Sequence, residues 1–158
     1  MPARLIRNIC SPPSVCMGDM GLIGRLHPML VHFPIGLVVI AAAAEMVAMM
    51  TGRWDWRAVA VANVRAGAVF TIGAAIAGWR LASSAGIEAT SSLEWHRWLG
   101  TIASVAVFAA ALAATGARGR SGFALWTYRI ALFWAAALVA VTGHLGGALV
   151  WGADFLRP

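Results

Sequence analysis

The sequence predicts an all-α integral membrane protein with four transmembrane helices in an up-down-up-down bundle. Hydrophobic residues make up 61% of the 158-residue chain and charged residues only 11%, whereas about a quarter of the residues in a soluble domain are charged. The hydrophobic residues gather in four long stretches, and a helix needs about 20 residues to cross the hydrocarbon core. Tryptophans lie near the ends of these stretches, at the level of the membrane interface that they prefer.

The four spans are predicted in order along one membrane domain, residues 27–158. The first covers 30–50 and follows the motif HPMLVHFPIG, whose prolines suit the first turns of a helix. The others cover 58–81, 96–115 and 124–151. The connections TGRWDWR and GARGRSG are short and basic, and ASSAGIEATSSLEW is polar, as expected outside the hydrocarbon.

Residues 1–26 are predicted to be a tail with no long helix. Pro12 and Pro13 interrupt it, and it lacks the continuous apolar region of a signal peptide. Met17 and Met20 are alternative starts, so part of the tail can be an artefact of the assigned start.

The two cysteines, Cys10 and Cys16, both fall in this tail. They form neither a paired CxxC zinc pattern nor the CxxCH motif that attaches haem. We expect them to have no role, unless the tail faces an oxidising compartment and forms a disulfide.

All twelve basic residues are arginine and the net charge is +6, but no basic stripe with interleaved aromatics indicates nucleic-acid binding. We define face A as the membrane side of the N-terminus, the second loop and the C-terminus, and face B as the opposite side. The face-B loops are rich in arginine and contain one acid, Asp55; the arginines are Arg53, Arg57, Arg118 and Arg120. Because cytoplasmic loops carry excess arginine, we predict a bacterial inner-membrane protein with face A in the periplasm.

The four histidines are all predicted to lie in the face-A half of the membrane. His27 and His32 precede or begin the first span, His96 begins the third, and His144 lies near the end of the fourth. Polar groups in lipid are costly and usually functional. His32 and His144 lie roughly 12 and 6 Å from the middle of their spans, so they are the predicted axial ligands of a haem b, with His96 as reserve partner.

Small and basic residues near the histidines support a haem. The motif VTGHLGGALVWG surrounds His144 with glycines that leave room for a flat ligand or for helix packing; they are Gly143, Gly146 and Gly147. Arg97 and Arg25 adjoin the His96 and His27 regions on face A. We predict that they balance the haem propionates or, alternatively, extend to the interface.

The sequence also allows a copper site in place of the haem, and it predicts an ion pair inside the membrane. Three imidazoles with Met29 would suit copper, although His27 and His32 point about 140° apart on a regular helix. Glu45 is the one acid well inside a span, and we expect it to pair with Arg65 as a structural ion pair rather than to form a proton path.

Three motifs resemble the bacterial membrane family known as domain of unknown function 2231. They are HPMLVHFPIG at 27–36, HRWLG at 96–100 and TGHLGGALVWG at 142–152. The resemblance implies a four-helix protein, because members look like four-helix proteins. Related domains occur beside c-type cytochrome modules, which implies respiratory electron transfer. The resemblance also marks all four histidines, together with Gly146 and Gly147, as motif positions.

The leading functional prediction is therefore a small b-type cytochrome subunit, more an electron carrier than a stand-alone enzyme. It would pass electrons between a quinone and another membrane or periplasmic redox subunit, such as a c-type cytochrome. The alternatives are a copper-binding membrane protein without haem and a cofactor-free anchor of a respiratory complex.

Overall fold

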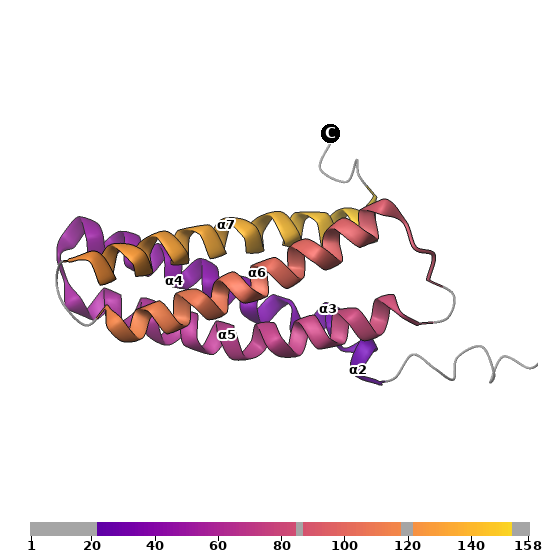
Figure 1. The fold of residues 1–158 in the computed structure, drawn as a ribbon, viewed down its shortest axis with the longest axis horizontal. Helices are drawn as coiled ribbons and strands as arrows, with labels where there is room; N and C mark the ends of the chain where they lie inside the picture. Colours follow the sequence, from indigo (N-terminus) through magenta and orange to yellow (C-terminus); the bar gives the residue numbers. More distant parts are fainter. Residues whose placement is uncertain (1–21, 85–86, 118–121, 153–158) are drawn as a thin grey trace, which may run out of the picture.

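The computed structural model describes residues 22–84, 87–117 and 122–152, which form helices and their connections (Figure 1). The helices are α2 (Leu22–Arg25), α3 (His27–Leu30), α4 (His32–Thr51), α5 (Trp54–Ala82), α6 (Ser91–Gly116) and α7 (Phe123–Trp151). Four segments are long and apolar enough to span a membrane: α3 together with α4, and then α5, α6 and α7. The predicted all-α fold with four membrane helices is confirmed.

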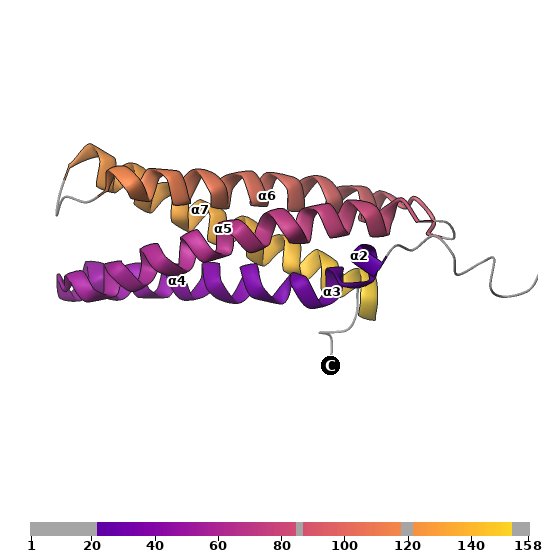
Figure 2. The same ribbon diagram turned by 90° about the horizontal axis from the view of Figure 1, so that it is seen from below.

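The long helices form a bundle in which the chain reverses direction at each connection (Figures 1 and 2). Around the bundle, α4 packs on α5, α5 on α6, α6 on α7 and α7 on α4, so α4 and α6 occupy opposite corners. The end of the bundle with α3, the start of α6 and the end of α7 corresponds to face A (Figure 1). The opposite end, with the α4–α5 connection, corresponds to face B. Which face lies in the cytoplasm stays a prediction.

Two helices begin earlier than the apolar stretches indicated. Helix α5 starts at Trp54 instead of 58, and α6 starts at Ser91 instead of 96. Their first turns contain polar residues, so hydropathy does not assign them to a span. In α6 the earlier start is stabilised by Thr90, which caps the helix by accepting the Leu93 N–H at 3.3 Å. The 29 residues of α5 make a helix of about 44 Å, which matches a bilayer with its headgroups.

Small residues fill the interior of the bundle, and larger apolar side chains face outward. Alanines dominate the buried positions, among them Ala41, Ala60, Ala77, Ala110 and Ala135, each fully buried. The larger side chains of Val69, Phe123 and Trp134 are 70%, 88% and 65% exposed. Since lipid is as apolar as the interior, membrane helices associate through close packing of small residues.

The end of the predicted tail is helical. Helix α2 packs against α5, and Gly24 lies so close that a Cβ there would be 3.2 Å from the Leu81 backbone. The tail residues Cys10 and Cys16, and the loop residues Arg118 and Arg120, lie outside the described residues.

A buried charge cluster corrects the expected pairing of Glu45 with Arg65. Glu45 is fully buried, and its Oε1 accepts a hydrogen bond from Arg129 Nε at 2.8 Å and lies 3.4 Å from Arg57 Nε. Arg65 is exposed. Arg57 and Arg65, both on α5, are eight residues apart, which places them about 80° apart around the helix. Of these two, Arg57 faces the interior.

Candidate histidine site

Two of the four histidines meet inside the face-A end of the bundle. The ring centroids of His27, on α3, and His96, on α6, lie 6.3 Å apart, and the ring planes are 78° apart. His27 packs on α5 and His96 on α7. These two helices occupy opposite corners of the bundle, so the contact crosses its interior. Both rings are half-buried.

Each of these rings is fixed by a main-chain carbonyl on a neighbouring helix. His27 Nδ1 lies 2.9 Å from the Ala74 oxygen on α5, and His96 Nδ1 lies 3.2 Å from the Thr142 oxygen on α7. A carbonyl oxygen only accepts, so Nδ1 carries the proton in both rings. The lone pair of each neutral imidazole is therefore on Nε2, which makes no hydrogen bond to another described residue.

A glycine makes room for each ring, one helical turn beyond the carbonyl. A Cβ at Gly78 would lie 2.7 Å from His27 Cε1, and a Cβ at Gly146 would lie 3.0 Å from His96 Cε1. The two histidine–carbonyl bonds span 47 and 46 residues. The α4–α5 and α6–α7 hairpins therefore hold their histidines in the same way.

The predicted ligands His32 and His144 are both exposed. His32 Nδ1 donates to the carbonyl of Pro28 at 2.6 Å, one turn earlier in the chain. The pairing of His32 with His144 stays a prediction, whereas the described contacts bring together His27 and His96.

Arg97 lies next to His96 at the face-A end, and its guanidinium carbon is 4.0 Å from the centre of the Trp79 ring. Its Nε is buried and has no hydrogen-bond partner among the described residues, and the same holds for Thr142 Oγ1. An orphaned, buried N–H beside the histidines indicates a missing acceptor. Arg25 lies at the end of α2 and is exposed.

The other predicted glycines have packing roles or remain open. A Cβ at Gly143 would lie 3.4 Å from Ile35 Cδ1, so this glycine allows α7 to approach α4. Gly147 is half-buried. Of the three glycines in the motif around His144, Gly146 is thus the one that accommodates a histidine, and that histidine is His96.

No group of three or more histidine, cysteine, aspartate or glutamate side chains with metal-binding geometry occurs within the described ranges. Met29, the expected thioether ligand, is 57% exposed. The three-imidazole copper site therefore gains no support from the fold.

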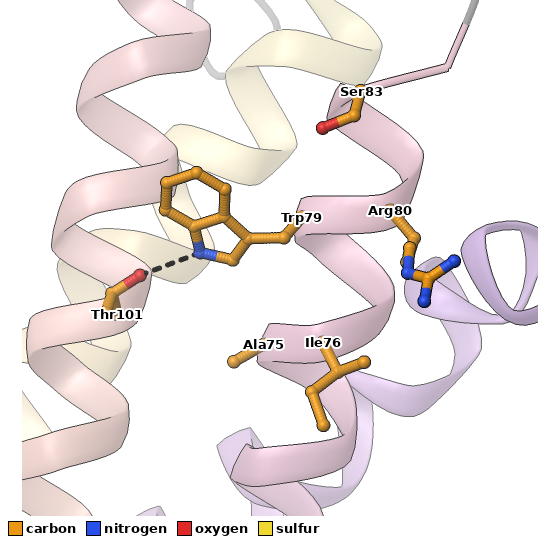
Figure 3. Close-up of a pocket in the computed structure, with 6 residues that line it drawn as sticks. All are labelled: Ala75, Ile76, Trp79, Arg80, Ser83 and Thr101. Carbon is orange, nitrogen blue, oxygen red and sulfur yellow. Dashed lines mark hydrogen bonds between the residues drawn. The ribbon is translucent and has the colours of Figure 1, made fainter.

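A lipid-facing groove of about 420 Å³ lies between α5 and α6 at face A (Figure 3). Its lining is mostly apolar, with Arg80, Ser83 and Thr101 as polar residues. The Trp79 indole N–H donates to Thr101 Oγ1 at 3.1 Å, and this bond, within the lining of the groove, ties the two helices together (Figure 3). Sequence reasoning missed Trp79 and Thr101, because an interfacial tryptophan is common in membrane helices.

We expect Gly78→Ala to destabilise the protein relative to Gly73→Ala. Both glycines lie on α5, but a Cβ at Gly73 meets nothing within 4 Å, whereas one at Gly78 strikes the His27 ring. Overpacking costs about 1–3 kcal/mol, while alanine at an open helix position gains up to about 1 kcal/mol. Thermal unfolding in detergent measures the difference, and equal stability of the two variants would show that His27 does not occupy this niche.

The fold and the site define a four-helix membrane protein with a histidine pair in its interior. The chain belongs to the family described as "Predicted membrane protein (DUF2231)", whose family model matches residues 25–155. This confirms the resemblance seen in the three sequence motifs. No curated protein and no solved structure matches the chain.

Proposed function

We propose that this protein is a membrane electron-transfer subunit that holds haem b between His27 and His96. It would carry electrons between a quinone and a periplasmic redox partner such as a c-type cytochrome. The proposal keeps the predicted cofactor and assigns it a different pair of ligands.

The observation that carries the proposal is the pair of Nδ1 bonds to the Ala74 and Thr142 carbonyls. Histidines that bind metals almost always donate their other ring N–H to a carbonyl or carboxylate, which fixes the tautomer and the ring orientation. His27 and His96 each have this second bond, and each leaves Nε2 as the basic nitrogen.

The spacing of the two rings suits a pair of axial ligands. A metal–imidazole bond of about 2.0 Å on each side, with each nitrogen about 1 Å from its ring centre, places the centroids roughly 6 Å apart. In the structure the ring centroids are 6.3 Å apart. Two aromatic rings that pack edge to face have a similar centroid separation. The hydrogen bonds to the carbonyls, and not the distance, therefore distinguish a ligand pair from ordinary ring packing.

Arg97 supplies the charge that a haem requires on this face. Its buried Nε has no hydrogen-bond partner among the described residues, and a propionate carboxylate is the acceptor that a guanidinium binds best. Stacking on Trp79 holds the guanidinium in place. A haem b held by His27 and His96 would supply one-electron chemistry, which fits an electron carrier.

The first experiment is haem and metal analysis of protein purified in mild detergent from cells supplied with a haem precursor. We expect one or more equivalents of iron, all extractable as the pyridine complex of haem b. Copper without haem would support the copper-binding alternative. Folded protein that contains neither would contradict the proposal and favour the cofactor-free anchor.

A further inference from the structure

Arg65 is an exposed charged residue near the middle of a membrane-spanning helix. It lies three residues before Ala68, the midpoint of α5, which is about 4.5 Å along the helix axis. The carboxylate expected to pair with it, that of Glu45, instead binds Arg129 and lies beside Arg57. A charged side chain at this depth is costly in lipid and is almost always paired or placed in a water-filled cavity.

The chain itself offers no carboxylate for Arg65. Arg65 forms no hydrogen bond or ion pair with another described residue. Apart from the fully buried Glu45, the acids lie in the tails, in connections or in the first turn of a helix; they are Asp19, Asp55, Glu88, Glu94 and Asp154. A second copy of the chain carries the same acids at the same levels. The negative charge that Arg65 requires must therefore come from a different molecule.

Arg65 borders a groove of about 260 Å³ on the outer side of α5 and α6. Two alanines of its lining are buried, Ala68 at 5% and Ala111 at 9% exposure, whereas Val69 and Leu112 beside them are 70% and 56% exposed. Small residues between larger ones let another helix approach closely, and membrane helices associate through such packing. The groove therefore suits a helix, with Arg65 as its charged contact.

The depth of Arg65 favours a membrane helix over a phospholipid as the source of the negative charge. Helix α5 is about 44 Å long and extends beyond the hydrocarbon core of about 30 Å by about 7 Å at each end. Arg65 lies eleven residues after Trp54, about 16 Å from the face-B end of the helix and thus about 9 Å inside the hydrocarbon. Lipid phosphates lie outside this core, whereas a carboxylate on a membrane helix can lie at the level of Arg65.

We propose that the groove between α5 and α6 binds a transmembrane helix of another protein, which carries an aspartate or glutamate near the middle of the bilayer. The carboxylate pairs with the Arg65 guanidinium, and Ala68 and Ala111 pack against the partner helix. This interaction is independent of haem binding, because Arg65 lies in the face-B half of α5 and the histidine pair lies at face A.

The test uses a synthetic leucine–alanine transmembrane helix with one central glutamate, reconstituted with the full-length protein in phosphatidylcholine vesicles. Energy transfer between labelled protein and labelled helix measures binding. We expect the glutamate helix to bind roughly tenfold more tightly than the same helix with glutamine. A helix with its glutamate moved seven residues towards either end should lose this preference, because the carboxylate then lies about 10 Å from the level of Arg65.

Arg65→Gln should bind the glutamate and glutamine helices equally, and Arg65→Lys should keep the preference for glutamate. Because Arg65 is exposed, we expect Arg65→Gln to unfold at the wild-type temperature, which separates lost pairing from lost folding. The matched control is Arg53→Gln, at an exposed residue paired with Asp55, which should bind as the wild type does.

Equal binding of the two helices by the wild type would overturn the proposal, and so would an undiminished preference in Arg65→Gln. Vesicles that contain phosphatidylglycerol test the competing source of charge. If this lipid abolishes the preference, the Arg65 side chain extends to a lipid phosphate, and the helix is not its partner. An unchanged preference in these vesicles supports the partner helix.

Discussion

Glu45→Gln is expected to destabilise the protein by about 3–5 kcal/mol, because it leaves two buried guanidiniums without their carboxylate. Glu45 is fully buried and lies 2.8 and 3.4 Å from the Arg129 and Arg57 Nε atoms. For a chain of this size the loss corresponds to a fall of roughly 10 °C in the unfolding midpoint. Helical circular dichroism during heating in detergent measures it.

Two further variants show whether this loss comes from the cluster. Glu88→Gln removes the same charge from an exposed residue in the α5–α6 connection, and we expect a change within about 0.5 kcal/mol. The double variant Glu45→Gln/Arg129→Gln should recover part of the loss, because it removes one of the two unbalanced charges. A Glu45→Gln protein as stable as Glu88→Gln would refute the importance of the ion pairs.

His27→Ala and His96→Ala are each expected to abolish stoichiometric haem binding. Each variant removes one of the two proposed haem ligands, which meet inside the face-A end of the bundle, and a metal site that loses a ligand should lose most of its affinity. The measurement is the haem-to-protein ratio of each purified variant by pyridine extraction. Gel filtration of the same samples shows whether the protein remains folded.

The matched controls are His32→Ala and His144→Ala, at exposed positions of the same face. We expect both to keep the wild-type ratio. If His32→Ala and His144→Ala lose haem while His27→Ala and His96→Ala retain it, the ligands are the pair predicted from depth along the spans. That result would overturn the assignment to His27 and His96 without removing the haem.

The fold was largely predictable from the sequence, because a membrane helix is recognised by length and hydropathy alone. The spans were found, and so was the gathering of histidines at one end of the bundle. The helix starts at Trp54 and Ser91 were missed, since their first turns are polar and lie at headgroup level.

The contacts inside the bundle could not be predicted, because they depend on how each helix is rotated. In a soluble helix a polar face shows which side is exposed, but here lipid and interior are both apolar. The rotation of α5 turns Arg57 towards Glu45 and leaves Arg65 outside. The contact between His27 and His96 could not be predicted for the same reason. Depth along the spans favoured His32 and His144 as a pair, but the helices turn His27 and His96 towards the interior. The two histidine–carbonyl pairs have nearly the same spacing, 47 and 46 residues, but this similarity can be recognised in the sequence only once the contacts are known.

The central claim is tested most directly by reduced-minus-oxidised absorption spectra of the wild type and His27→Ala, recorded side by side in detergent. The account predicts a sharp alpha band near ~560 nm in the wild type, as expected of haem b with two histidine ligands. It predicts that this band is absent from folded His27→Ala. A flat spectrum from folded, haem-supplied wild-type protein, or an unchanged band in His27→Ala, would contradict it.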